Sequence, residues 1–402
     1  MSVQADRDRM LILILGALMA FGPLSIDLYL PSFPLIAASF SVSPARVELS
    51  LASFFVGLAL GQLLYGPLSD RLGRRPAVLL GLGVYAIASM ACAFAQSLEF
   101  LITARFIQAL GACAGIVVTR AVVRDRFGAK ESARVFSMLM LVMGAAPILA
   151  PLIGGAVSRF AGWRALFGLL AAASLICWVA VFRVLPETRR VNPERARSLQ
   201  VLRDRVFLGH ALAGGLAYAG MFAYITGSSF VFIELFGIPS HHFGWVFGTN
   251  AVALIASSQF NRRLLQSREM NWVLRRAFLA LALAGSLLAL AGYLGSGFWG
   301  VAVPLWAYVG ILGMTYPNTT AVALQGQGAQ AGAASAWLGT IQFSLAAGAA
   351  WMVSWLHDGS ALAMSTVVGG CGISSLMVYR FVDHFGRTGD AGCGCQQISE
   401  RT

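Results

Sequence analysis

Two ionisable side chains lie inside long apolar stretches of this sequence, where a charge is costly. Asp27 falls near the end of the first apolar stretch, and Arg105 falls within the fourth. A lone Asp or Arg at the middle of a membrane helix costs about 2.5 to 3.5 kcal/mol on insertion scales, so such residues usually have a function. A carboxylate can take up and release a proton, whereas a guanidinium keeps its charge. We expect Asp27 to exchange protons and Arg105 to favour its ionised form.

The depth of these two residues along their helices supports this expectation. If the first stretch runs outward and the fourth inward, Arg105 lies about seven residues, roughly 10 Å, from the outer end of its helix. Asp27 then lies at a similar depth. We therefore expect both side chains to face one central cavity and to interact directly or through water. The alternatives are a static polar pair, or an Asp27 that reaches the membrane interface without exchanging protons.

A charged stretch interrupts the apolar sequence at residues 65–76, which read YGPLSDRLGRRP. Gly66 and Pro67 are expected to end one helix, Gly73 to allow a tight turn, and Pro76 to open the next helix. The aspartate can then cap a helix or pair with an arginine, while the arginines contact anionic lipid headgroups. A plain loop that only fixes orientation in the membrane is the alternative. The charged residues are Asp70, Arg71, Arg74 and Arg75.

Apolar runs of about 20 residues, long enough to cross a bilayer, account for most of the chain. Hydrophobic residues make up 58% of the sequence and charged residues 11%, against about 25% in a typical soluble domain. Because the runs are rich in Leu, Ala and Gly without strand alternation, they favour helices over barrel strands. The sequence predicts an all-α membrane protein with twelve spans, at about 9–30, 50–69, 77–95, 98–119, 135–157, 164–185, 206–233, 242–261, 273–295, 298–320, 334–356 and 361–384.

Basic residues fall mainly on one side of these spans. All but four of the 29 Lys and Arg residues lie in segments assigned to the cytoplasm, the exceptions being Arg46, Arg105, Arg159 and Arg164. The positive-inside rule therefore places both chain ends in the cytoplasm. The longest polar stretch separates six spans from six, which is typical of transporters built from two parallel repeats. We divide the chain into an N-terminal half, a cytoplasmic linker, a C-terminal half and a cytoplasmic tail: 1–185, 186–205, 206–385 and 386–402.

Three motifs resemble those of the major facilitator superfamily. GPLSDRLGRRP resembles the family's loop signature G-x-L-x-D-R-x-G-R-R, and RFIQALGACAG (105–115) resembles its fourth-span motif. GAAPILAPLIGG (144–155) resembles the fifth-span motif of antiporters, except that Ala150 stands where the motif has Gly. Together with PLSIDLYLPSFP (23–34) and FVFIELFGIPSHHFGWVFGTN (230–250), these motifs make the chain most similar to the Bcr/CflA drug-resistance branch.

This resemblance extends from Ile14 to about Phe385 and implies the major facilitator fold, with twelve helices in two six-helix halves. It implies that Asp70 and the first arginine, Arg71, act in a latch that holds the halves together when the carrier faces outward. It also associates Arg105 with proton coupling. The remaining implied motif residues are Gly66, Gly73, Arg74 and Arg75 of the latch, and Gly144, Pro147, Pro151, Gly154 and Gly155 of the antiporter helix.

Polar and aromatic residues of several spans are candidates for a drug-binding cavity, since aromatic faces provide area and amides fix orientation. Ordinary helix packing explains each of them equally well. The candidates are Tyr29, Gln108, Tyr218, Tyr224, Asn250, Tyr316 and Asn318. The glycine pairs 57/61, 111/115 and 244/248 repeat a spacing that lets membrane helices approach closely.

Several other functions are excluded or weakly supported. The only Lys, Lys130, follows Ala129, so a Walker A motif is absent, and no catalytic constellation or cofactor site is expected. The basic residues mark topology rather than a nucleic-acid surface. Cys393 and Cys395 have no second ligand pair nearby, and no metal site is expected.

The resemblance implies export of chemically varied antibiotics in exchange for protons, across a bacterial inner membrane. The partners are then the drug, protons and the lipid bilayer, and nothing demands more than a monomer. A proton-coupled exporter of a normal metabolite is one alternative. A membrane sensor that binds a ligand without transporting it is another, from a different class.

Overall fold

The computed structural model describes residues 2–127, 129–188, 200–325, 327 and 330–394, and every regular element in these ranges is helical. Two short segments follow the first helix: η1 (Leu30–Ser32) and α2 (Phe33–Phe40). A π-helical turn, η3 (Phe230–Leu235), continues α8. The long helices are α1 (Ser2–Asp27), α3 (Pro44–Leu72), α4 (Arg74–Ala93), α5 (Leu98–Arg126), α6 (Ala129–Ala161), α7 (Trp163–Val184), α8 (Arg205–Ser229), α9 (Ser240–Leu264), α10 (Met270–Tyr293), α11 (Gly297–Leu324), α12 (Ala331–Trp355) and α13 (Leu362–Gly394).

Each of the twelve predicted apolar runs lies on one of these long helices. Ten segments of the described chain are long and apolar enough to cross a membrane. The other two helices are α6, whose described apolar part is the shorter Ala145–Ala161, and the more polar α9. Because backbone groups in lipid must be paired within the segment, these helices form a multi-pass membrane protein.

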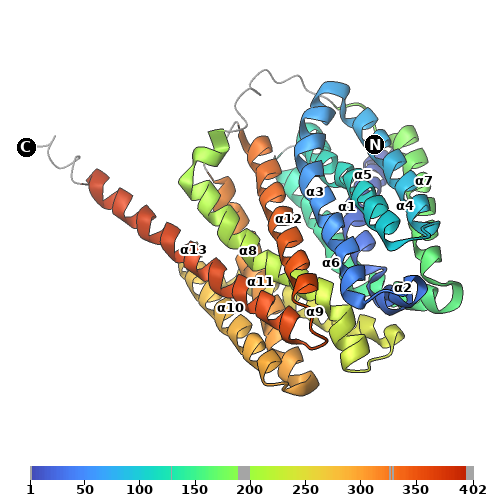
Figure 1. The fold of residues 1–402 in the computed structure, drawn as a ribbon. Helices are drawn as coiled ribbons and strands as arrows, with labels where there is room; N and C mark the ends of the chain where they lie inside the picture. The colour runs from blue at the N-terminus through green and yellow to red at the C-terminus, as the bar shows by residue number, and fades with distance from the viewer. Residues whose placement is uncertain (1, 128, 189–199, 326, 328–329, 395–402) are drawn as a thin grey trace, which may run out of the picture.

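We call the helices up to α7 the first helix group and those from α8 onward the second helix group; in Figure 1 they lie largely on opposite sides of the bundle. The main contacts between the groups join α3 to α12 and α6 to α9. We call the end of the bundle that carries η1 and α2 the η1 end. The opposite end, where the chain passes from α7 to α8, is called the linker end, and both α1 and α12 begin there (Figure 1).

Glycines allow unusually close approach where α6 meets its neighbours. A Cβ on Gly154 would lie 1.8 Å from the carbonyl oxygen of Leu28, and one on Gly155 would lie 3.0 Å from the carbonyl oxygen of Ser240. A Cβ on Gly244 of α9 would lie 2.6 Å from the side chain of Leu152. These small residues therefore bring the backbones of α1, α6 and α9 together at the η1 end.

Two predicted boundaries differ from the structure. The helix predicted to end at Gly66 and Pro67 continues through the proline, and α3 ends at Leu72 before Gly73. Pro76 does lie in the first turn of the next helix, as expected. The last helix, α13, extends past the predicted boundary at residue 385. Residues 189–199 of the predicted linker and 395–402 of the predicted tail lie outside the described residues.

We predict that Gly154→Ala lowers the melting temperature of the purified protein in detergent. The added Cβ overlaps the Leu28 carbonyl, and overpacking of this kind costs about 1 to 3 kcal/mol. Gly168→Ala is the matched control, because no heavy atom lies within 4 Å of its Cβ position on α7. Its melting temperature should stay level or rise slightly, since Ala favours helices over Gly. Equal melting temperatures for the two variants would contradict the close approach of α6 to α1.

Candidate functional site

Asp27 is the last residue of α1 and is buried, with 3% of its surface exposed. It lies close enough to the phenol groups of Tyr218 and Tyr224 on α8 to interact with them electrostatically. Among the described residues, it forms no ion pair or hydrogen bond. A buried carboxyl group is stable only where its charge is compensated or absent. Asp27 belongs to the first helix group and lies within electrostatic range of the second, at the boundary between the two.

Arg105 is completely buried inside the first helix group. Its guanidinium donates to the Ser25 carbonyl oxygen at 2.8 Å and to the Gln108 side-chain oxygen at 2.6 Å. The same group lies 4.3 Å from the ring centroid of Tyr29 and 4.2 Å from that of Phe54. Cation–π attraction of this kind is stronger when water is excluded. Neutral acceptors and aromatic faces therefore hold Arg105, in place of a carboxylate.

The predicted direct interaction of Asp27 with Arg105 is absent among the described residues. Arg105 bonds to the backbone of Ser25, while Asp27 lies within electrostatic range of Tyr218 on α8. Side chains two positions apart on a helix point about 160° away from each other, and the Ser25 hydroxyl contacts Tyr85 of α4. Depth alone could not reveal this, because it says nothing about the direction of a side chain around the helix axis.

The aromatic candidates of the second helix group lie together. The rings of Tyr218 and Tyr316 stack with centroids 4.5 Å apart, and Phe222 meets Tyr218 edge-on at 5.2 Å. The Asn250 amide donates to the Tyr224 hydroxyl at 2.9 Å. With Asp27 within electrostatic range of Tyr218 and Tyr224, this cluster combines aromatic faces, hydroxyls, one amide and one carboxyl group. We call these six residues the α8 cluster: Asp27, Tyr218, Phe222, Tyr224, Asn250 and Tyr316.

Three other cavity candidates lie elsewhere. Tyr29 and Gln108 belong to the surroundings of Arg105, where Gln108 also donates to the Ser89 hydroxyl at 2.7 Å. Asn318 exchanges two hydrogen bonds with Asn261, at 2.9 and 3.1 Å. These contacts join the two amides within the second helix group, away from the residues of the α8 cluster that contact one another. The prediction that Asn318 lines a drug cavity therefore stays a prediction.

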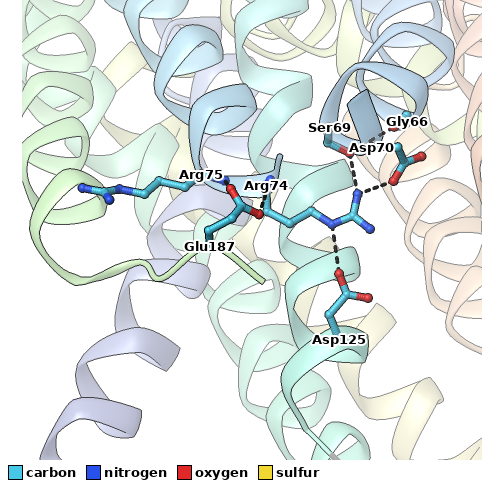
Figure 2. Close-up of polar contacts among 7 residues, drawn as sticks. All are labelled: Gly66, Ser69, Asp70, Arg74, Arg75, Asp125 and Glu187. Atoms are coloured by element: carbon cyan, nitrogen blue, oxygen red, sulfur yellow. Dashed lines mark hydrogen bonds and ion pairs between the residues drawn. The ribbon is translucent and has the colours of Figure 1, made fainter. Parts of the chain in front are cut away.

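The charged loop forms a compact network at the linker end, shown in Figure 2. The Arg74 guanidinium forms ion pairs with Asp70 and with Asp125 of α5, the latter at 2.9 Å. It also donates to the Ser69 hydroxyl at 2.9 Å. The Arg74 side chain is 3% exposed and that of Asp125 is 7% exposed. Buried pairs of this kind are strongly destabilised when one partner is removed, because a charge is then left unpaired.

Glu187, which follows α7, binds the start of α4. Its carboxylate accepts hydrogen bonds from the backbone N–H groups of Arg74 and Arg75 at 2.9 and 3.2 Å (Figure 2). These are orphan donors of a helix N-terminus, where negative charge is favoured. Gly73 is required beside this contact, because its φ is +106° and a Cβ would lie 2.4 Å from the Glu187 carboxylate.

Arg74, and not Arg71, is the arginine that pairs with Asp70 in the structure. Arg71 is exposed and makes no ion pair with any residue that the structure describes. Asp70 lies in the last turn of α3 and Arg74 begins α4, so the turn at Gly73 brings their side chains together. Arg75 instead donates to the Phe182 carbonyl oxygen and lies over the Phe182 ring. Sequence reasoning also missed Asp125 and Glu187. The position of Asp125, an acid just after the fourth apolar run, could have indicated a partner for one of the arginines.

The predicted antiporter helix corresponds to α6. Pro147 and Pro151 lie inside it, and Gly154 and Gly155 form the close contacts with α1 and α9 described above. Gly144 also lies in α6, but its surroundings are outside the described part of the chain. The motif therefore lies at a contact between the two helix groups, where small residues set the separation of the helices.

We predict that Arg74→Ala lowers the thermal stability of the protein far more than Arg71→Ala. Loss of the Arg74 guanidinium leaves Asp70 and Asp125 without this cation, and breaking a buried pair costs about 3 to 5 kcal/mol. The exposed Arg71 is the matched control, and its loss should change stability by about 0.5 kcal/mol or less. Melting temperatures in detergent would measure both effects. An equal loss of thermal stability in Arg71→Ala would contradict the assignment of the buried ion pairs to Arg74.

Comparisons with known proteins agree with this architecture. A bicyclomycin resistance protein homolog from Haemophilus influenzae is 33% identical over 379 residues, covering 92% of this chain and 95% of that protein. A chloramphenicol resistance protein from Pseudomonas aeruginosa is 31% identical over 315 residues, covering 76% and 71%. The crystal structure of a D-xylose–proton symporter, 15% identical, covers 92% of this chain and 97% of its own with a TM-score of 0.72, which shows the shared fold. The family model of the Major Facilitator Superfamily matches residues 13–350, and the chain therefore belongs to this superfamily of transporters.

Proposed function

We propose that this protein exports small hydrophobic or amphipathic drugs in exchange for protons, by alternating access. The observation that carries the proposal is the α8 cluster, in which the buried Asp27, with no cation partner among the described residues, lies within electrostatic range of a group of tyrosines between the two helix groups. The names of the bicyclomycin and chloramphenicol resistance relatives support drugs of these kinds as substrates. A bacterial inner membrane is the expected location, since these relatives are bacterial.

In this proposal the two helix groups are the two halves of the transporter, which move relative to each other during alternating access. We assign residues 1–185 and 206–385 to the N-terminal and C-terminal halves, joined by the linker 186–205. The linker end is assigned to the cytoplasm because the arginine-rich loops lie there, in line with the positive-inside rule. The η1 end then faces outward. Contacts between the halves are concentrated at α3–α12 and α6–α9, so these helices would slide or rock during transport.

Protons would supply the energy. One proton entering the cell yields about 2.3 kcal/mol per 100 mV, which at perfect coupling maintains roughly a fifty-fold gradient of a neutral solute. Asp27 is the proposed coupling carboxyl group, because drug and proton would compete for the same α8 cluster. Arg105 is proposed to act indirectly, by fixing the backbone of α1 at Ser25 near Asp27. A one-to-one exchange would need no further energy source.

Drug-driven proton movement in acidified inverted membrane vesicles tests this proposal. Adding a chloramphenicol- or bicyclomycin-like compound should raise the internal pH, because each drug molecule that enters the vesicle releases protons through the carrier. A pH-sensitive dye follows the change. We predict that Asp27→Asn abolishes the drug-driven signal, while Asp27→Glu, which keeps a titratable carboxyl group, retains part of it. A normal signal in Asp27→Asn would show that Asp27 is not the coupling site.

A second prediction concerns the drug-binding face. Tyr218→Ala should raise the drug concentration needed for half-maximal proton movement by about two- to tenfold, since an aromatic pair contributes about 0.5 to 1.5 kcal/mol. Tyr218→Phe keeps the ring and should behave like the wild type. The same vesicle assay measures both variants. Equal effects of the two substitutions would mean that the hydroxyl, and not the aromatic face, binds the drug.

A further inference from the structure

A second buried carboxyl group lies at the η1 end. It does not belong to the α8 cluster, and the mechanism proposed above gives it no role. Glu48, in the second turn of α3, is 1% exposed. One of its carboxyl oxygens has no hydrogen-bond partner in the described part of the chain, and the other lies 3.2 Å from the Ser354 hydroxyl of α12. Glu48 therefore bridges the two helix groups at one of their main contacts. We propose that Glu48 is a proton-binding site whose protonation is required for the outer side of the transporter to close.

The number of hydrogen-bond donors and acceptors around Ser354 supports a protonated Glu48. The Ser354 hydroxyl lies 3.2 Å from both the Glu48 carboxyl oxygen and the Ala350 carbonyl oxygen. A hydroxyl has one hydrogen to donate, and carbonyl and carboxylate oxygens can only accept. If the hydroxyl donates to Ala350, the contact with Glu48 is satisfied only when a carboxylic acid O–H donates to Ser354. The Ala350 carbonyl also accepts the backbone N–H of Ser354 within α12, so the hydroxyl is free to turn toward either oxygen. Among the described residues, an ionised Glu48 would have at most this one hydroxyl as a donor for two buried carboxylate oxygens, whereas a protonated Glu48 carries no charge and can itself donate to Ser354.

The charged groups around Glu48 do not compensate an ionised carboxylate. No Lys or Arg among the described residues forms an ion pair with it. Glu234 of η3 lies within electrostatic range of Glu48, and it is an acid rather than a cation. Arg46 and Glu99, from the starts of α3 and α5, pair with each other at 2.5 Å on the exposed surface. An ionised Glu48 would thus be a buried, unpaired charge next to another acid.

His357, which follows α12, is the other titratable group beside this contact. Its ring lies 4.3 Å from that of Phe230 in η3, and burial lowers the pKa of His357. Its protonation adds a positive charge at low pH, so it must be tested as a separate pH sensor. Farther along α3, the Ser50 hydroxyl lies 3.1 Å from the Tyr29 hydroxyl and forms a hydrogen bond with this neutral group.

The structure around Glu48 is a closed contact between the helix groups. The Ser229 hydroxyl at the end of α8 donates to the Leu30 carbonyl oxygen of η1 at 2.8 Å. Gly155 of α6 and Ser240 of α9 meet at the same end. The π-helical turn η3 follows directly on Ser229, and such turns inside helices are frequent at functional sites. When these contacts separate, Glu48 becomes exposed to solvent, where its ionised form is stable.

The direction of the pH dependence follows from this exchange of environments. Closing buries Glu48 and requires a proton, whereas opening allows the proton to leave. If one proton is released on opening, the ratio of open to closed molecules rises by up to tenfold per pH unit. This rise begins once the pH exceeds the ordinary pKa range of a carboxyl group exposed to water. An acidic outer solution would therefore close the outer side after the drug has left. This inference depends on the alternating access of the proposed function, but not on the identity of the drug.

Distances across the η1 end provide the test. Gln96 and Ser296 are exposed and lie between α4 and α5 and between α10 and α11, one in each helix group. We would replace both with cysteine in the full chain, replace the six native cysteines, and attach spin labels. Pulsed electron paramagnetic resonance in lipid nanodiscs then measures the label separation between about pH 5 and about pH 9. We expect one short distance at low pH and a growing longer distance as the pH rises.

Substitutions identify the group responsible. Glu48→Gln keeps the shape and the hydrogen bond to Ser354 without a titrating group, so the short distance should persist at every pH. Glu48→Asp should retain the pH dependence, and His357→Gln and Glu234→Gln should also retain it. If Glu48→Gln does not fold, Ser354→Ala replaces it. Loss of the acceptor for the acid hydrogen should then shift opening to lower pH.

Several outcomes would overturn the inference. The inference would be rejected if the label separation in the wild type did not change with pH. It would also be rejected if the Glu48→Gln variant showed the same pH-dependent opening as the wild type. Loss of the pH response in His357→Gln alone would assign the sensor to the histidine. An unshifted Ser354→Ala variant would reject the proposed hydrogen bond. The vesicle assay is separate: a normal distance response without drug-driven proton movement would leave the gate intact and reject the drug antiport.

Discussion

Burial of charge away from water is the constraint on which the rest of this structure depends. The helices are apolar enough to cross a membrane, so each ionisable group between them must be neutralised in some way. Arg74 is neutralised by two carboxylates, whereas Arg105 is held by a carbonyl, an amide and aromatic faces. Among the described residues, Asp27 has no ion-pair or hydrogen-bond partner and Glu48 has only the Ser354 hydroxyl, so in the proposed mechanism a proton removes their charge.

In the proposed mechanism this difference separates the structural charges from the functional ones. Groups with fixed partners, such as Arg74 with Asp125, tie α4 to α5 at the linker end. Groups neutralised by protons would instead respond to the solution on whichever side is open. Asp27 and Glu48 both lie where the two helix groups meet, so a change in their protonation would act on the contacts that must break and re-form during transport.

Close backbone contacts complete this arrangement. Gly154, Gly155 and Gly244 let α1, α6 and α9 approach at the η1 end with few side chains between them. Smooth surfaces of this kind can separate without pulling interlocked side chains apart, while the hydrogen bonds of Ser229 and Ser354 give the closed contact its specificity. The proposed gate and the proposed drug site are thus successive layers of one interface between the helix groups.

The sequence by itself determined the membrane class, the number of long helices and the position of the charged loop, because hydropathy and motif spacing are local properties. The family followed from the same motifs and was confirmed by the comparisons. Only the tertiary structure decided which charges meet: Arg74 rather than Arg71 binds Asp70, Arg105 binds the Ser25 carbonyl rather than Asp27, and Asn318 binds Asn261. These pairings depend on the rotation of each helix about its axis and on packing between distant segments, which the local pattern along the chain does not encode.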